Sequence, residues 1–252
     1  MLRKVPAITA LFWTIKILTT AQGEAFSDYL VHTINPYYAV ALGLLGFVVA
    51  LAIQLRLARY HPGAYWFAVL MVAVFGTMGA DAAHIELKIP YAGTAAICAL
   101  GLAVVFSLWY ATERTLSIHS IETRRRELFY WAAVLATFAM GTAVGDLTAY
   151  TLQLGFFKAG LLFTVVYALP FLANLLLRRA DVFFFWFAYV ITRPLGASYA
   201  DWLGVPKYLG GLDLGRGTVS VALTVAFAVL VGYLWITEER PASRPQPAIE
   251  AG

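Results

Sequence analysis

Charged residues and cysteines are scarce in this chain of 252 residues. Only 13% of the residues are charged and 61% are hydrophobic, whereas a typical soluble domain is about 25% charged. A water-soluble fold of this length could not bury so much apolar surface in one core, so the composition excludes an ordinary soluble protein. The single cysteine, Cys98, excludes a disulfide framework and is expected to be a small buried thiol.

Recognisable catalytic motifs are also missing. The sequence contains no metallopeptidase helix motif, nucleophile elbow, phosphate-binding loop or haem-attachment motif. We therefore predict that the protein is not an enzyme. The formal net charge of +4 does not indicate nucleic-acid binding, because the positions of the basic residues follow a membrane topology.

The sequence contains several long apolar segments with few charged residues. Runs of about 20 residues cross about 30 Å of hydrocarbon as a helix that rises about 1.5 Å per residue. We predict eight transmembrane helices, near residues 6–30, 37–57, 64–86, 91–111, 128–152, 156–177, 182–203 and 216–236. The expected fold class is an all-α integral membrane protein.

Basic residues gather in one set of the connections between these runs. One side has twelve of them: Arg3, Lys4, Arg56, Arg59, Arg114, Arg124, Arg125, Arg126, Arg178, Arg179, Arg240 and Arg244. The other side has four: Lys88, Lys158, Lys207 and Arg216. Positive residues favour the cytoplasmic side of a membrane. Both termini and the loop near 112–127 are therefore predicted to be cytoplasmic.

Four tandem repeats account for the eight runs. In each odd-numbered run a Trp is followed by nine residues, a Gly, four residues and an Asp. The copies are Trp13/Gly23/Asp28, Trp66/Gly76/Asp81, Trp131/Gly141/Asp146 and Trp186/Gly196/Asp201. We place the repeats near 6–57, 64–111, 128–177 and 182–236, within a single transmembrane domain at 1–237. A tail at 238–252, rich in Pro, Ala and charge, is predicted to be disordered in the cytoplasm.

Two helices per repeat mean that every repeat enters the membrane in the same direction. The repeats are thus predicted to be parallel and related by a pseudo-symmetry axis along the membrane normal. Each Trp should be an interfacial anchor and packing residue, and each Gly a packing contact. Each Asp should lie about 22 Å further along its helix, in the outer leaflet. Helical sequence is expected to continue about two turns beyond Asp28, Asp81 and Asp146.

A family resemblance rests on five passages: Phe12 to Thr20, Gly23 to Asp28, Phe129 to Trp131, Gly141 to Ala143 with Gly145 and Asp146, and Ile191 to Ala197. Through them the chain resembles bacterial membrane-anchored proteins built from four tandem two-helix repeats of unknown function, each with a characteristic Trp. The resemblance covers nearly the whole chain except the tail. It implies the fold, the repeat number and a location in the bacterial inner membrane, but no activity.

Charged residues inside the membrane point to function. A carboxylate in hydrocarbon costs about 2.5–3.5 kcal/mol on insertion scales, so four Asp at one depth favour a shared, hydrated axis. One stripe of the first helix, with a spacing of four, consists of Lys16, Thr20, Glu24 and Asp28. In the fourth repeat Arg193 takes the place of Thr20. The repeats are therefore similar but not equivalent, which argues against a strictly four-fold pore.

We hypothesise a transporter or channel for cations, with a Mn-like divalent metal or protons as cargo, because hard cations prefer oxygen ligands. The predicted cation-binding and translocation residues are Glu24, Asp28, Asp81, Asp146, Asp201, Thr20, Thr77, Thr142 and Thr192. The predicted metal ligands are Asp28, Asp81, Asp146, Asp201 and His84. Lys16 and Arg193 would balance the acidic charge or gate the path. A divalent metal is a candidate as cargo, and no resident cofactor is identified.

Two alternatives stay open. In the first, the protein is a non-transporting scaffold or sensor, and neutralising Asp81 or Asp146 impairs folding more than any flux. In the second, two aspartates act as general acid and base of an intramembrane aspartyl enzyme; only the dipeptide Gly145-Asp146 supports this, and a dyad does not need four repeats. The predicted partners are the lipid bilayer and an inorganic cation. The sequence is compatible with a homo-oligomer but does not fix the oligomeric state.

Overall fold

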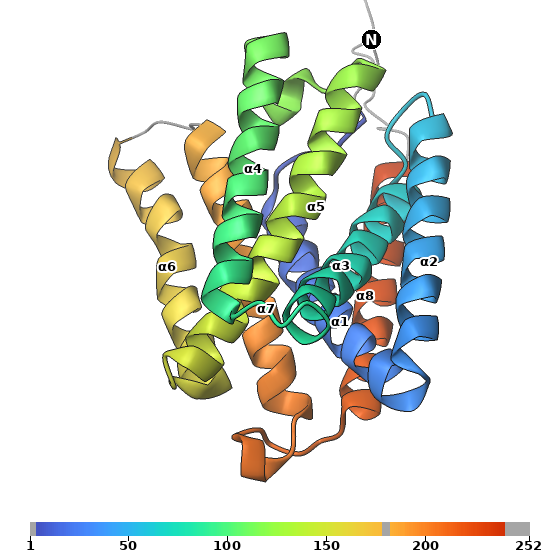
Figure 1. Ribbon diagram of the computed structural model, residues 1–252. Coiled ribbons are helices and arrows are strands. Elements are labelled where there is room, and N and C mark those ends of the chain that lie inside the picture. The colour runs from blue at the N-terminus through green and yellow to red at the C-terminus, as the bar shows by residue number, and fades with distance from the viewer. Residues whose placement is uncertain (1–3, 178–181, 240–252) are drawn as a thin grey trace, which may run out of the picture.

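Helices account for all the regular structure in residues 4–177 and 182–239, the part of the chain that our computed structural model describes. Eight long α-helices form one bundle (Figure 1). They are α1 (Ala10–Thr33), α2 (Pro36–Arg56), α3 (Pro62–Ile85), α4 (Tyr91–Glu113), α5 (Arg124–Asp146), α6 (Gly155–Leu177), α7 (Val182–Gly204) and α8 (Arg216–Glu239). Each predicted run corresponds to one helix. The predicted disordered tail lies outside the described residues from position 240 onward.

The helix starts differ from the prediction where a side chain caps the first turn. α1 begins at Ala10 rather than near residue 6, because Thr9 Oγ1 accepts a hydrogen bond from the Phe12 backbone N–H at 3.1 Å. α5 begins at Arg124 rather than near residue 128, since Thr123 caps it through the Arg126 N–H at 3.3 Å. Hydrophobic runs alone do not reveal where such caps start a helix.

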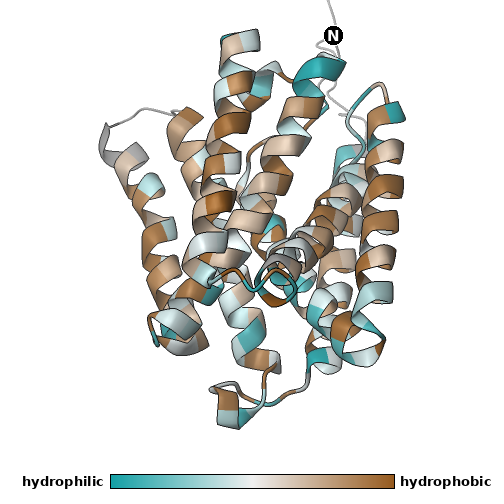
Figure 2. Ribbon diagram, viewed as in Figure 1, coloured by the Kyte–Doolittle hydropathy of each residue, from teal (hydrophilic) through white to brown (hydrophobic). Residues whose placement is uncertain are grey.

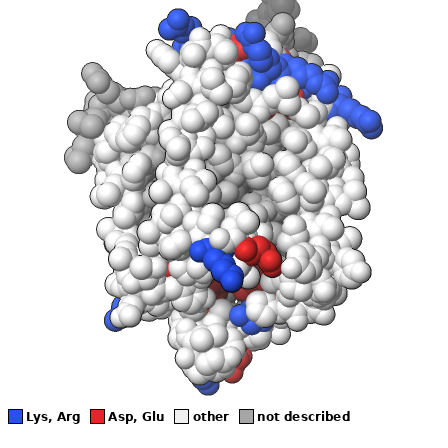
Figure 3. Space-filling view, viewed as in Figure 1, with Lys and Arg blue, Asp and Glu red and all other residues white. Residues whose placement is uncertain are grey.

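Within the described residues, six helices are long and apolar enough to cross a membrane: α2, α3, α4, α5, α6 and α8. α1 and α7 are of similar length, but α1 contains Lys16, Glu24 and Asp28, and α7 contains Arg193 and Asp201. Figure 2 shows that apolar residues predominate along the outer helices. Figure 3 shows many Lys and Arg at the end with the N-terminus, a mixed group of acidic and basic side chains towards the opposite end, and a wide uncharged belt between them.

The odd-numbered helices form the inside of the bundle. α1 packs against α3, α3 against α5, α5 against α7, and α7 against α1, so the four close a ring. In their apolar stretches, 61% of the residues of α3 and 56% of those of α5 are buried, compared with 22–28% in the even-numbered helices. The exposed side chains of the even helices are mostly Leu, Val, Ile and Phe, which suits contact with lipid.

Each even-numbered helix packs against the odd helix of the next repeat. α2 lies on α3, α4 on α5, α6 on α7, and α8 returns to α1. The two helices of one repeat touch each other much less. Consecutive repeats are therefore interlocked, and the last helix closes the bundle onto the first. A single repeat has no partner within itself for its apolar surface, as is usual in repeat proteins.

The repeat glycines mark the crossings of the inner helices. A Cβ atom added at any of them would come closer than 3.0 Å to the next inner helix. The residues met by Gly23, Gly76, Gly141 and Gly196 are, in that order, Ala73, Phe138, Arg193 and Thr20. Every one of these lies three residues before the Gly of its own repeat. The same close helix contact thus occurs four times around the ring, and the predicted packing role of the glycines accounts for it.

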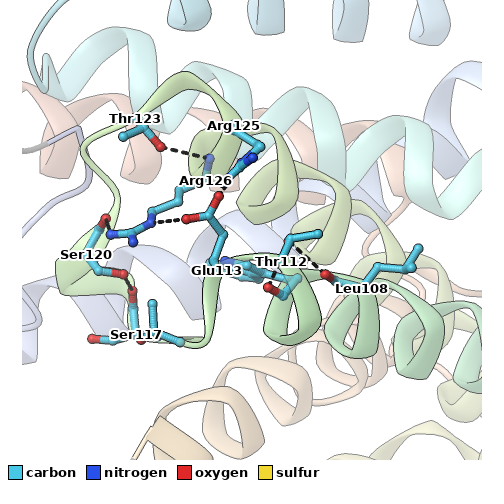
Figure 4. Close-up of polar contacts among 10 residues, drawn as sticks. Leu108, Thr112, Glu113, Ser117, Ser120, Thr123, Arg125 and Arg126 are labelled. Atoms are coloured by element: carbon cyan, nitrogen blue, oxygen red, sulfur yellow. Dashed lines mark hydrogen bonds and ion pairs between the residues drawn. The ribbon is translucent and has the colours of Figure 1, made fainter.

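The connection between α4 and α5 is folded onto the bundle (Figure 4). Glu113, at the end of α4, accepts hydrogen bonds from Arg125 and, at 2.6 Å, from Arg126 Nε. The indole Nε1 of Trp186 donates to the Leu116 carbonyl oxygen at 2.9 Å and fastens the loop to the beginning of α7. The longest predicted loop is therefore a short, anchored cap.

Candidate functional site

The contacts inside the ring fall into layers of equivalent repeat positions. Counted from the repeat Trp, these positions are −1, +3, +7, +11 and +15. In α1 the last four are the predicted stripe of Lys16, Thr20, Glu24 and Asp28. Position −1 is aromatic and position +15 is Asp in every repeat, whereas positions +3, +7 and +11 differ in chemistry between repeats, so each layer has its own character.

The layer at the Trp end is aromatic. The residue before each Trp packs on the Trp of the next repeat, with ring centroids 5.5–6.1 Å apart. The pairs are Phe12 on Trp66, Tyr65 on Trp131, Tyr130 on Trp186 and Phe185 on Trp13. The hydroxyls of Tyr65 and Tyr130 also share a hydrogen bond. Aromatic rings thus fill the centre of the ring at this end.

Three of the four repeat Trp residues are buried and therefore do not contact lipid or solvent. Trp66, Trp131 and Trp186 are at most 5% exposed. The expected anchoring at a lipid interface was wrong for these three, because the aromatic residue of the preceding repeat covers each indole. Their packing role, the other half of the prediction, agrees with their contacts.

Lys16 lies in the next layer and is 1% exposed. Its ammonium donates a hydrogen bond to Thr192 Oγ1 at 3.1 Å and lies 4.2 Å from the ring centroids of both Phe138 and Tyr189. Two cation–π contacts of this kind stabilise a positive charge. Among the described residues no carboxylate forms an ion pair with Lys16. Lys16 thus makes no direct contact with the acids that it was expected to balance.

Arg193 fills the centre of the following two layers and is fully buried. Its guanidinium pairs with the Glu24 carboxylate and donates hydrogen bonds to the hydroxyl oxygens of Thr77 and, at 2.8 Å, of Thr142. Its Nη1 donates to the Thr20 carbonyl oxygen at 3.2 Å. The predicted charge balance between Arg193 and the acids is therefore present as a buried ion pair that joins all four inner helices.

Two of the predicted site threonines join helices instead of lining the centre. Thr20 Oγ1 donates to the Thr192 carbonyl oxygen at 2.9 Å, across the crossing of α7 and α1. Thr192 Oγ1 donates to the Tyr189 carbonyl oxygen at 2.6 Å and accepts from Lys16. Thr77 and Thr142, by contrast, present their hydroxyls to Arg193. These two occupy the same repeat position as Glu24.

The four repeat aspartates form the last layer, and all are half-buried. Asp28 forms an ion pair with Arg216 Nε of α8 at 3.0 Å. No described residue forms an ion pair or hydrogen bond with the side-chain carboxylate of Asp81, Asp146 or Asp201. Asp81 and Asp201 each lie within electrostatic range of both Asp28 and Asp146. The structure thus brings the four predicted carboxylates into one neighbourhood.

The aspartates lie closer to the helix ends than predicted. α3 ends at Ile85, four residues after Asp81, and α5 ends at Asp146, where a π-helical turn, Leu147–Thr151, follows. Helical backbone therefore continues for four residues past Asp81 and for five residues past Asp146, which is less than the two turns expected. Neither aspartate is followed within five residues by a Gly or Pro that would mark the helix end, which is why the pattern alone extended the helices.

The predicted metal site is not assembled. Among residues 4–177 and 182–239, no three His, Cys, Asp or Glu side chains gather in a group that could hold a metal ion. His84 Nδ1 lies 2.8 Å from the Ile89 carbonyl oxygen, and its ring stacks on Tyr91 at 3.7 Å between centroids. These contacts hold the imidazole beside the α3–α4 connection.

Comparison with known families gives four tandem matches to one repeat. The matches cover residues 11–60, 64–115, 129–180 and 184–240, in agreement with the four repeats predicted from the Trp, Gly and Asp spacing. Comparisons with curated proteins and with solved structures gave no match. Because the repeat model covers most of the chain, the protein belongs to the DUF347 family, described as a repeat of unknown function.

Proposed function

We propose that the protein is an integral membrane protein of eight transmembrane helices that carries cations along the axis between α1, α3, α5 and α7. The observation that carries the proposal is the layer of four repeat aspartates, three of them without a partner among the described residues, above a buried Arg193–Glu24 ion pair. Carboxylates at such a depth are costly. Binding of transported cations would explain why the bundle contains carboxylates despite this free-energy cost.

The membrane arrangement follows from the contacts in the ring. α1 and α7 are enclosed by other helices, so their charged residues need not face lipid. The identical glycine contacts around the ring support four parallel repeats related by a pseudo-symmetry axis. The excess of basic residues in one set of connections supports a topology in which both termini lie in the cytoplasm, with the protein in a bacterial inner membrane.

The half-buried aspartates and the fully buried Lys16 and Arg193 suggest that the outer end of the path is accessible and the inner half closed. Cations would enter through Asp28, Asp81, Asp146 and Asp201 and meet Glu24, Thr77 and Thr142 one helical turn further in. Beyond them, Lys16 and the aromatic layer close the axis. A closed inner half suits a carrier that alternates between two states better than a permanently open channel.

The oxygen-rich layers suit hard cations and protons. Protons or small cations are the cargo that we favour, because the geometry gives the metal hypothesis no support. A scaffold whose buried charges only stabilise the bundle is the second candidate, favoured by the fully buried Arg193–Glu24 pair. The four equivalent aspartates do not favour an aspartyl enzyme, because such an enzyme needs only two of them.

Cation flux into proteoliposomes tests the function. Purified wild-type protein would be reconstituted, and uptake of H⁺, Na⁺, K⁺, Mg²⁺, Mn²⁺ and Zn²⁺ followed with fluorescent reporters against protein-free liposomes. We expect saturable uptake of at least one cation. Uptake at the protein-free rate for all six would reject transport of these cations and favour the scaffold.

A further inference from the structure

Arg193 occupies a cage of oxygen atoms. The atoms that accept from its guanidinium are a carboxylate oxygen of Glu24, the hydroxyl oxygens of Thr77 and Thr142, and the carbonyl oxygen of Thr20. They come from α1, α3 and α5, and Arg193 reaches them from α7. A carboxylate, two hydroxyls and a carbonyl form the kind of ligand set that proteins use for cations. In this cage the cation is the guanidinium of Arg193, which is covalently part of α7.

The cage does not satisfy the guanidinium completely. Arg193 Nε is buried and has no hydrogen-bond partner in the described part of the chain. One helical turn away, Asp81, Asp146 and Asp201 have no partner either, and Arg193 lies within electrostatic range of all three. Alternative acceptors for the guanidinium therefore exist on the side from which a cation would enter.

We propose that this cage is a cation-binding site and that Arg193 is its built-in occupant, which competes with an incoming cation for Glu24, Thr77 and Thr142. The displaced guanidinium then pairs with the aspartate layer. The class of ligand is a small monovalent cation no larger than guanidinium, since the cage already fits that group. This inference rests on the proposed function for its role and on the Arg193 contacts for its geometry.

Chemical rescue tests the cage. Arg193→Ala removes the tethered cation and leaves its oxygen ligands in place. Low millimolar guanidinium chloride is expected to raise the thermal unfolding temperature of this variant in detergent saturably, and to leave the wild type unchanged. Urea, an uncharged molecule of the same shape, serves as the control at equal concentration. The double variant Arg193→Ala/Glu24→Gln, which lacks the anionic ligand, should not respond.

A second variant covers the case in which Arg193→Ala does not fold. Arg193→Gln keeps an amide donor near the cage but ends short of the guanidinium position, so the same saturable response is expected. Equal effects of guanidinium and urea, or an undiminished response after Glu24→Gln, would overturn the inference. So would the absence of any response in both variants.

The outcome is independent of the flux assay. A saturable guanidinium response without flux of any cation would retain the cage as a binding site and remove transport as its purpose. Flux of a cation together with no guanidinium response would leave the proposed function standing and reject the role of Arg193 as occupant.

Discussion

Replacing Arg193 by methionine is expected to destabilise the folded protein by about 3–5 kcal/mol, the usual cost of breaking a buried ion pair by removing one partner. The Glu24 carboxylate would stay buried with the Thr77 hydroxyl as its remaining donor, at 3.2 Å. Thr142 would lose its guanidinium partner as well. Glu24 is 5% and Thr142 2% exposed, so bulk solvent does not reach them to replace these hydrogen bonds.

Unfolding of purified protein in detergent, followed by denaturant titration, measures this loss. The double variant Arg193→Met/Glu24→Gln should recover most of it, since both charges are then gone. Arg125→Met is the matched control: its side chain is 68% exposed, and Arg126 continues to hold Glu113. An exposed pair is worth about 0–1 kcal/mol. Equal losses for Arg125→Met and Arg193→Met would contradict the description of the centre.

Adding a single methyl group at Gly196 is expected to cost at least about 1–3 kcal/mol, as overpacking of a tight contact does. The new Cβ would lie 2.8 Å from the Ala21 backbone nitrogen and would also collide with the Thr20 side chain. Backbone atoms cannot rotate away as a flexible side chain can. α7 and α1 would have to separate, and the ring would open at that crossing.

Gly79→Ala is the matched control, because it adds the same methyl group at a position with no close neighbour. Gly79 lies in α3, and a Cβ there would meet nothing within 4 Å. Gly79→Ala should therefore be neutral or stabilising by up to about 1 kcal/mol, because Ala favours a helix more than Gly does. The measurement is again denaturant unfolding in detergent. If Gly196→Ala were as stable as Gly79→Ala, the close crossing would be wrong.

Much of the inner ring could be predicted from spacing alone. The Trp, Gly and Asp pattern located the four repeats, and the four-residue stripe through Glu24 identified a line of residues that the centre uses. The glycines were expected to be contacts, and each is one. These features are periodic, and periodicity in sequence becomes periodicity in space when units repeat.

Some contacts of the inner ring have a visible pattern in the sequence, but the pattern does not show which residues meet. An aromatic residue precedes every repeat Trp, as in Phe12-Trp13 and Tyr65-Trp66. This dipeptide is the source of the aromatic layer, but a single sequence does not show that the aromatic residue and the next repeat's Trp meet. Nor could it show that each even helix serves the following repeat, because the choice depends on how helices cross and not on their composition.

Partners of the charged residues were the least predictable. Arg216 was assigned only by its side of the membrane, yet it pairs with Asp28 across the interface of α8 and α1. Lys16 was expected near the acids, yet it lies between Phe138 and Tyr189. Such pairings depend on where each side chain points once the helices have packed into the ring. Opposite charge alone does not determine which residues pair.

The most direct test of cation transport along this axis is flux through the triple variant Asp81→Asn/Asp146→Asn/Asp201→Asn. Asp213→Asn is the control, since Asp213 is exposed, lies outside the ring and has a positive φ that Asn accepts. We predict that flux of the wild-type cargo falls at least about tenfold, the equivalent of about 1.4 kcal/mol, while stability in detergent is unchanged or higher. Undiminished flux in the folded triple variant would contradict the account.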